Sequence, residues 1–251
     1  MRFNPPPNWP LPPGWTPPPR ANRLSGGVAI ALVVGVVVVI VAVAMVIAVP
    51  VMLRHNASSS SASAPKHTSG TDAIRVTSSR LVTDPQTGQP KVVLSLYEDF
   101  LCPFCRRFEE SFGPAFNQLI DSGEVAADYY MVAILDRGKR DYSSRAGAAA
   151  YCVADQSIDA FRRFHAALYA AQPSELASSF PDNARLIQQA QEAGAGDVAA
   201  CINDGTYVSL VKSMAEKADI KGTPTVRING EDYDPSTPDA LVARIKQITG
   251  G

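Results

Sequence analysis

The sequence predicts an α/β domain with an inserted all-helical subdomain, preceded by a single transmembrane helix. A long run without charged or strongly polar residues, Val28–Val49, indicates the transmembrane helix. Strand, helix and strand signals then follow one another between residues 91 and 135, as in a parallel β-α-β unit. Residues 143–218 carry helical patterns and few strand signals, which places the helical subdomain between that unit and the last strand signals.

Composition excludes two classes of protein. The 251 residues carry 23 Lys and Arg against 24 Asp and Glu, a formal net charge of −1, and no basic run that would serve a nucleic-acid binder. Four cysteines are too few for a small domain held together mainly by disulfides. The core must therefore form mainly by apolar packing.

Residues 1–27 contain the proline-rich segment NPPPNWPLPPGWTPPP. Proline lacks a backbone N–H and fixes φ, so this segment cannot form a regular helix or a central strand. We expect a disordered cytoplasmic tail. A docking peptide for an aromatic-lined groove is the alternative.

Residues 28–53 are the predicted transmembrane anchor. As a helix, Val28–Val49 would be roughly 33 Å long, enough to cross the hydrocarbon core of a bilayer. The run is longer than the apolar region of a secretory signal and follows a long tail, so we expect an uncleaved signal anchor, with a cleaved signal as the alternative. Three arginines precede the run and one follows it closely, which favours a cytoplasmic N-terminus.

Residues 54–72 are rich in serine and alanine and predict a flexible linker. The globular region, residues 73–251, is therefore expected to lie outside the cytoplasmic membrane, where disulfides persist. The expected localisation is that of a single-pass cell-membrane protein with an extracytoplasmic domain.

The first half of the globular region predicts one β-α-β unit. The segment KVVLSLYEDF (91–100) predicts a strand covered on both faces, because apolar residues occupy both of its sides. The helix expected over 103–120 repeats aromatic side chains at helical spacing. A second strand, VAADYYMVAIL (125–135), follows it, and this order is typical of parallel strands.

The second half predicts the helical insertion and a return to the sheet. Five helical segments are separated by Pro, Gly, Asp or Asn: residues 143–155, 157–171, 183–193, 197–204 and 207–218. Strand signals return in TPTVRI (223–228), followed by an Asn-Gly turn and a short partner strand at 231–233. An amphipathic helix over 237–248 completes the pattern.

Cys102 and Cys105 come directly after the first predicted strand, in the stretch DFLCPFCRRF. A structural zinc site needs four ligands, and only this pair is close in the sequence. A purely structural disulfide is disfavoured because the loop between the two cysteines is tiny and restrains the unfolded chain little. Pro103 suits the first position of a helix, which places Cys102 at the N-cap, where the macrodipole favours a thiolate. We interpret the pair as a redox-active disulfide, with Cys102 as the nucleophile and Cys105 as the resolving thiol.

The motif CPFC after a strand, the β-α-β order, the helical insertion and GTPT before a late strand resemble the DsbA family of thioredoxin-fold thiol-disulfide oxidoreductases. The resemblance covers about residues 73–251, and together with the anchor it is similar to the tethered DsbA-like proteins of actinobacteria. It implies a thioredoxin-like fold with an inserted all-helical subdomain. It also implies a cis Thr223–Pro224 bond that presents the Thr223 backbone to a substrate peptide beside Cys102.

Phe104 departs from the best-known member of that family, which has histidine at this position. A protonated histidine near the thiolate stabilises the reduced form, and phenylalanine cannot do so. We therefore expect a less depressed Cys102 pKa and a milder oxidant than in that member. The expected active-site support consists of Pro103, Phe104, Thr223 and Pro224.

Three further titratable residues have open interpretations. Glu98 is in phase with the apolar residues of its strand, so it is either a buried carboxylate that assists proton transfer near the pair or a surface residue at the strand end. Asp99 has the same two interpretations, and neither acid is assigned as catalytic. His165 shows no ligand spacing and is expected to be a core or surface residue without a chemical role.

Cys152 and Cys201 remain once the active-site pair is assigned. They are 49 positions apart on separate predicted helices. In an oxidising compartment we expect them to form a structural disulfide, an inference by elimination among three connectivities. Free buried thiols are the alternative.

The leading hypothesis is a membrane-tethered oxidase that introduces disulfides into exported proteins through Cys102–Cys105. Its expected partners are unfolded exported substrates with cysteines and, by the family resemblance, a quinone-linked membrane oxidase of DsbB or vitamin K epoxide reductase-like type. No metal, dissociable cofactor or nucleic acid is implied, and we expect a monomer. The alternatives are an extracytoplasmic reductase or isomerase using the same site, and a non-catalytic peptide-binding module.

Overall fold

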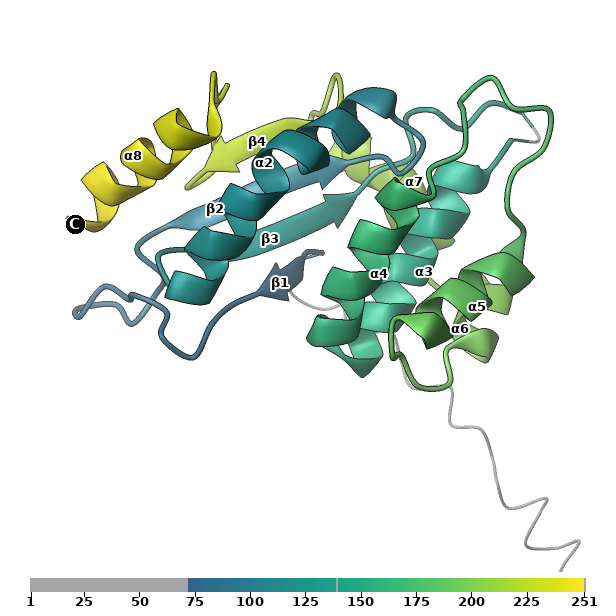
Figure 1. Ribbon diagram of the computed structural model, residues 1–251, viewed down its shortest axis with the longest axis horizontal. Helices are drawn as coiled ribbons and strands as arrows, with labels where there is room; N and C mark the ends of the chain where they lie inside the picture. The colour runs from purple at the N-terminus through teal and green to yellow at the C-terminus, as the bar shows by residue number, and fades with distance from the viewer. Residues whose placement is uncertain (1–71, 139, 251) are drawn as a thin grey trace, which may run out of the picture. The chain divides into compact units, whose positions relative to one another are not determined.

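The computed structural model describes residues 72–138 and 140–250 (Figure 1). The predicted tail and anchor, and all of the predicted linker except its last residue, lie outside this part of the chain. Within the described ranges, no helix has both the length and the apolarity needed to cross a membrane.

In the described part of the chain, five strands form one sheet in the order β1-β3-β2-β4-β5. The strands are β1 (Ile74–Val76), β2 (Val93–Glu98), β3 (Ala126–Met131), β4 (Thr225–Ile228) and β5 (Glu231–Asp232). The helices are α2 (Pro103–Ser122), α3 (Tyr142–Gln156), α4 (Ile158–Ala170), α5 (Asn183–Glu192), α6 (Ala199–Asn203), α7 (Val208–Lys217) and α8 (Pro238–Thr249). Only β2 and β3 pair in parallel, and α2 connects them, because parallel neighbours need a crossover.

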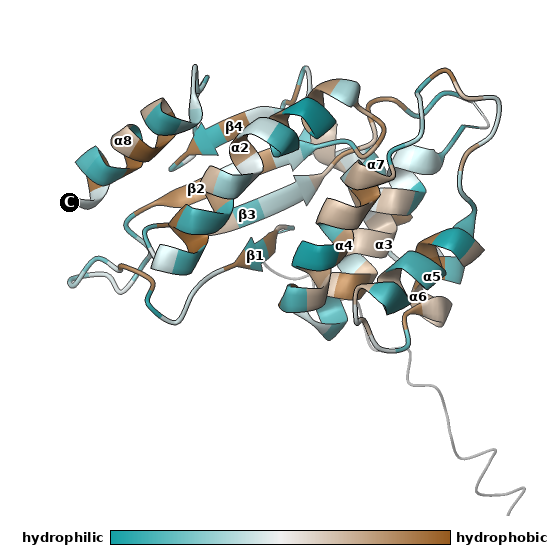
Figure 2. Ribbon diagram, in the orientation of Figure 1, coloured by the Kyte–Doolittle hydropathy of each residue, from teal (hydrophilic) through white to brown (hydrophobic). Residues whose placement is uncertain are grey.

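β2 lies in the middle of the sheet and is buried on both faces, as its sequence predicts. Leu94 belongs to a core that also contains Phe116 of α2. Tyr97, an odd number of positions away and so on the other face, belongs to a second cluster with Met214 of α7. Figure 2 shows β2 largely in the brown of apolar residues, whereas α8 carries both brown and teal residues, as an amphipathic surface helix does. This burial fixes the end of β2, from which the chain enters α2.

The inserted subdomain, α3 to α7, follows β3 and precedes β4 (Figure 1). α3 is its central helix and is buried along almost all of its length. A run of small residues allows this close packing: a Cβ placed on Gly147 would lie 2.8 Å from Val211 Cγ1 and 3.1 Å from Met131 Cβ. Cys152 and Cys201 form a disulfide that joins α3 to α6.

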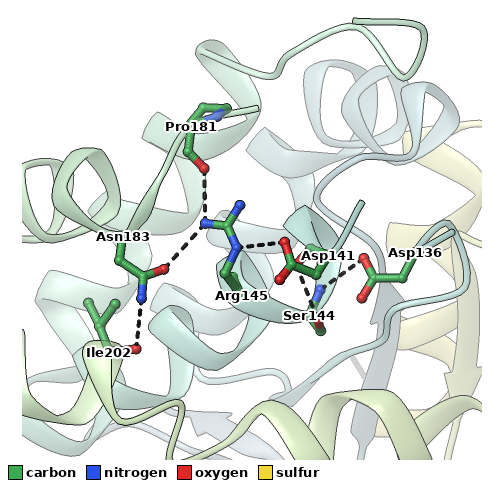
Figure 3. A network of polar contacts seen from close by, with 7 residues as sticks. All are labelled: Asp136, Asp141, Ser144, Arg145, Pro181, Asn183 and Ile202. Atoms are coloured by element: carbon green, nitrogen blue, oxygen red, sulfur yellow. Dashed lines mark hydrogen bonds and ion pairs between the residues drawn. The ribbon is translucent and has the colours of Figure 1, made fainter. Parts of the chain in front are cut away.

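A polar network fixes the loops around the start of α3 (Figure 3). The Arg145 guanidinium bonds the Asp141 carboxylate at 2.8 Å and donates to the Pro181 carbonyl at 2.9 Å and to Asn183 Oδ1 at 3.3 Å. The Asn183 amide in turn donates to the Ile202 carbonyl at 3.3 Å. One side chain of α3 thus joins the segment that leads into α5 to the rest of the subdomain.

β3 is shorter than predicted. The sequence pattern indicates a strand over 125–135, but β3 ends at Met131. Its neighbour β2 ends at Glu98, whose carbonyl accepts the Val132 N–H at 2.8 Å, so no strand backbone is left to pair with. The apolar residues beyond this point form a loop, and the Leu135 N–H donates to the Asp99 carboxylate at 3.0 Å.

Candidate active site

Cys102 and Cys105 lie where β2 gives way to α2. Cys102 is the N-cap of α2 and Pro103 occupies the first turn, where a missing N–H has no cost. The Cys102 N–H donates to the Asp99 carbonyl at 2.9 Å, which holds the turn that precedes the helix. Both cysteines are thiols; Cys102 is 5% exposed and Cys105 is fully buried. Of the two sulfurs, only that of Cys102 can be reached from solvent.

The Thr223–Pro224 loop lies against Cys102. The bond between these two residues is cis, and Cys102 Sγ lies 3.4 Å from the Thr223 carbonyl oxygen, to which it donates when it is protonated. These residues are 121 positions apart, and the antiparallel pairing of β4 with β2 brings them together. A groove of about 360 Å³ continues from Pro224 along β4 and is lined by Phe108 and Tyr233, among others.

The two thiols have opposite electrostatic environments. The pKa of Cys102 is lowered to about 5 by a hydrogen bond from the Cys105 thiol, and further by the Thr223 side chain and by the N–H groups of Cys105 and Phe104. Burial raises the pKa of Cys105 well above its usual range, and its contact with Cys102 raises it further. Cys102 is therefore a stable thiolate near neutral pH, whereas Cys105 keeps its proton.

Phe104 points to the surface and is 61% exposed. The Arg107 guanidinium lies 4.5 Å from the centre of its ring. The ring contributes no charge to the thiolate; only its backbone N–H stabilises Cys102.

A buried acid–histidine cluster lies behind the cysteine pair. Glu98, at the end of β2, is fully buried, and His165 Nε2 of α4 lies 2.8 Å from Glu98 Oε2. His165 Nδ1 lies 3.9 Å from Glu109 Oε2 of α2. These three are side-chain types that bind metal ions, and one ligand atom from each lies within 4.8 Å of the other two. The two ring nitrogens of His165 face different carboxylates.

Burial determines the protonation of this cluster. It raises the pKa of Glu98 well above its usual range, and burial together with the Glu98 charge raises the pKa of Glu109 to about 8. Burial also lowers the pKa of His165, which is therefore a neutral imidazole. Near neutral pH the cluster holds exchangeable protons on groups that border the redox pair.

Asp99 is also buried, but its oxygens hold the backbone in place. One carboxylate oxygen accepts the Leu101 N–H at 2.8 Å and the other accepts the Leu135 N–H at 3.0 Å. Burial raises its pKa to about 6. Asp99 thus fixes the turn before Cys102 and the loop after β3.

Gln172, just after α4, holds the same turn from the other side. Its Nε2 donates to the carbonyls of Phe100 and Cys102, each at 3.0 Å. The sequence analysis did not single out Gln172 or Glu109. Glu109 had one usable signal, since it lies four residues after Cys105 and so shares its face of the helix. Gln172 had none, because it lies in a predicted helix break.

The structure places His165 in a polar contact that the sequence analysis did not predict. The sequence analysis expected His165 either in the core or at the surface, and it lies in the core. There its ring bonds the buried Glu98 carboxylate. The partners lie 67 positions apart and meet only because α4 packs on the end of β2, so ligand spacing along the sequence could not reveal the pair.

A family model described as Thioredoxin matches residues 82–247, which include both cysteines and the Thr223–Pro224 loop. The chain belongs to the thioredoxin family. The structure of oxidised DsbA from Mycobacterium tuberculosis is 60% identical, with a TM-score of 0.69, over 72% of this chain and 94% of that one. MdbA from Corynebacterium matruchotii, a thiol-disulfide oxidoreductase, is 25% identical with a TM-score of 0.55, over 64% of this chain and 82% of its own.

Within the thioredoxin family the chain is therefore a protein disulfide oxidoreductase of the DsbA type. A curated relative, the serine/threonine-protein kinase PknE of Mycobacterium tuberculosis, is 30% identical over 146 residues. That match covers 53% of this DsbA-type chain and 26% of the kinase, so the chain spans about a quarter of that relative.

Proposed function

We propose that this DsbA-type protein is a membrane-tethered extracytoplasmic oxidase that introduces disulfides into exported proteins at Cys102–Cys105. The observation that carries the proposal is the contrast between the two thiols, a stabilised Cys102 thiolate beside a protonated Cys105. Stabilising the thiolate stabilises the reduced pair relative to the disulfide, so the disulfide readily accepts electrons from a substrate.

The exchange follows from the accessibility of the sulfurs. A substrate thiolate attacks Cys102 Sγ of the enzyme disulfide, the Cys102–Cys105 bond breaks, and Cys105 leaves as a thiolate that takes up a proton. A second substrate thiolate attacks the mixed disulfide, which releases the oxidised substrate and the Cys102 thiolate. The enzyme gains the two electrons that the substrate loses, and the groove beside Pro224 offers a place for the substrate chain.

Reoxidation requires a partner that accepts these electrons. A quinone-linked membrane oxidase of DsbB or vitamin K epoxide reductase-like type fits a domain that a short linker holds near the membrane. The apolar run Val28–Val49 and the linker after it support the tether and the extracytoplasmic position. Cell fractionation tests both: the full chain should sediment with membranes and yield to external protease, and deletion of residues 1–53 should abolish sedimentation.

A reductase or isomerase is the second candidate, and Phe104 favours it. Without an imidazolium at this position the thiolate is less stabilised, so the disulfide is a weaker oxidant than one flanked by histidine. The two directions differ in reduction potential: about −120 mV indicates an oxidase and about −270 mV a reductase.

The deciding experiment measures that potential and compares oxidation of a reduced unfolded protein with reduction of insulin. We expect the first activity to dominate. Cys102→Ser should abolish both activities, whereas Cys105→Ser should accumulate a mixed disulfide with the substrate. A Cys102→Ser variant with unchanged activity would contradict every enzymatic assignment of this pair.

A further inference from the structure

The buried cluster behind the cysteines extends from the redox pair to a second opening in the surface. Cys105 and Glu109 are one turn apart on the same face of α2. Glu98 is fully buried at the end of β2, and its charge acts on the Cys105 thiol. His165 stands between Glu98 and Glu109, with one ring nitrogen toward each. The three side chains thus form a continuous polar path through an otherwise apolar core.

Three polar atoms along this path lack a hydrogen-bond partner among the described residues. They are Glu98 Oε1, Glu109 Oε1 and the Tyr169 hydroxyl. Both Glu109 and Tyr169 nevertheless stabilise the Glu98 carboxylate, so the three groups lie close to one another. Leaving such groups unpaired in a core is costly, so they mark a polar site within the core.

The path ends at a cavity between α2 and α4. This cavity has a volume of about 360 Å³, and Glu109 and Tyr169 form part of its wall beside the small residues Gly113, Ala166 and Ala170. Glu109 keeps 16% of its side chain exposed. The lining includes neither Cys102 nor the Thr223–Pro224 loop, so this opening is separate from the substrate face.

We propose that Glu98, His165 and Glu109 carry the Cys105 proton between the redox pair and this side cavity. The inference rests on the disulfide exchange proposed above and names the route of its proton. A substrate joined to Cys102 covers the front of the site while Cys105 is buried, so the proton must pass through the protein. A rear opening lets solvent supply or receive it at that moment.

The chemistry balances at each step. When a substrate thiolate breaks the Cys102–Cys105 bond, Cys105 leaves as a thiolate and takes the proton of the Glu98 carboxyl group. Glu98 regains a proton from Glu109 through His165, and Glu109 regains one from water in the cavity. Reoxidation runs the transfers in reverse. The other titratable groups that face the cluster are Cys102, Tyr129 of β3 and Tyr169 of α4.

Comparing a large substrate with a small one distinguishes proton transfer through Glu109 from a purely structural role of Glu109. In the full chain, Glu109→Gln should slow reduction of the enzyme disulfide by a reduced unfolded protein about 10-fold or more, as loss of a proton-transfer group does. With dithiothreitol, which leaves the front open to water, the same variant should stay within about 2-fold of wild type. Quenched-flow alkylation of the Cys102 thiol gives both rates.

Ala166→Trp tests the opening without altering a titratable group. Ala166 is exposed on α4 and lines the cavity, so an indole there should close its mouth. We expect the same selective slowing with the large substrate. Glu110→Gln is the matched control. Glu110 also lines the cavity, but its side chain is 64% exposed and pairs with Arg106 rather than with the buried cluster, so its loss should slow neither substrate.

Equal slowing of both substrates by Glu109→Gln, or no slowing by either variant, would overturn the proton route. A wild-type protein that cannot oxidise the unfolded substrate would instead contradict the proposed function. Selective slowing by both variants, with an unaffected Glu110→Gln, supports the route.

Discussion

The Cys102 sulfur owes its low pKa to several weak donors rather than to one charge. The Cys105 thiol is the strongest of these donors, and Thr223 and two backbone N–H groups add to it. These donors come from two distant parts of the chain: the first turn of α2, and the loop before β4 that carries Thr223. The reactivity of Cys102 therefore depends on the folded site. Substituting one donor at a time measures how much that donor lowers the Cys102 pKa.

Thr223→Val should raise the pKa of Cys102 above its value of about 5. The substitution keeps the shape but removes the Thr223 hydroxyl, which has no other hydrogen-bond partner among the described residues and is free to donate to the thiolate. A hydrogen bond to a charged group contributes about 1.5–3 kcal/mol, so we expect a rise of roughly one pH unit or more. Thiolate absorbance followed against pH gives the pKa, and Thr206→Val, at an exposed position of the insertion, should leave it unchanged. An unaltered pKa in Thr223→Val would show that the hydroxyl does not reach the sulfur.

At the scale of the elements, α4 connects the inserted subdomain to the chemistry. Its side chain His165 bonds the end of β2, and Gln172 beyond its last turn bonds the carbonyls of Phe100 and Cys102. α3 in turn supports α4, and both need close packing around them. The insertion is thus part of the active site's frame, and damage to its packing should be measurable as lost stability.

Gly147→Ala should destabilise the fold by about 1–3 kcal/mol through overpacking. The new methyl group would lie 2.8 Å from Val211 Cγ1 and 3.1 Å from Met131 Cβ, and neither neighbour can move freely because both are buried and Val211 is β-branched. Urea denaturation measures the loss. Gly196→Ala is the control, since its methyl group would make only an ordinary contact of 3.6 Å with Gln156 Oε1. Equal stability of the two variants would contradict the tight crossing of α3 and α7.

Removing the disulfide by a double Cys152→Ala, Cys201→Ala substitution should lower the free energy of unfolding by about 4 kcal/mol. This value comes from the loss of restraint on an unfolded chain cross-linked over 49 positions. Denaturation of the double variant measures the effect, and mass spectrometry of an unreduced digest checks the pairing in the wild type. A peptide linking Cys102 to either residue would refute this connectivity.

At the scale of the whole molecule, the redox state sets how stability depends on pH. Between pH 5 and 9 the unfolded reduced chain carries a proton on Cys102 that the folded chain has lost, so folding of the reduced form becomes more favourable as pH rises. The oxidised form lacks this thiol. The stability of the reduced form relative to the oxidised form should therefore increase from pH 5 to 9 and lose this contribution below pH 5.

Denaturation of both forms across this range, with Cys152–Cys201 kept intact, measures the difference. The buried acids Asp99 and Glu109 titrate in both forms, so their contributions largely cancel in the comparison. Cys102→Ser should abolish the pH-dependent difference. A difference that stays constant with pH would show that the folded thiol is not ionised.

Most of the fold could be predicted from the sequence because periodicity records which side of each element is buried. The strand before the cysteines, the helix after them and the five helices of the insertion all occur, with ends shifted by a few residues. The N-cap position of Cys102 followed from Pro103 alone. The end of β3 could not be predicted in this way. Val132–Leu135 are apolar and look like a continuation of the strand, but the pairing stops because the neighbouring strand β2 ends.

The cluster behind the site could be predicted only in part. Glu98 follows the alternating pattern of the apolar residues of its strand, so the sequence allowed either a buried carboxylate or a surface residue at the strand end. Its partner His165 lies 67 positions away, and local patterns contain no information about such a contact. Gln172 likewise acts on carbonyls about 70 positions distant. Contacts between side chains of separate elements depend on tertiary packing, which a single sequence does not display.

The separation of 121 positions between Cys102 and Thr223 also orders events in time. At about 5–20 residues per second, a ribosome makes the Thr223–Pro224 loop roughly 6–24 seconds after the cysteines. During this interval the nascent chain carries its thiols without the loop that lowers the pKa of one of them. The share of the thiolate stabilisation that Thr223 contributes can therefore arise only after this loop has been made.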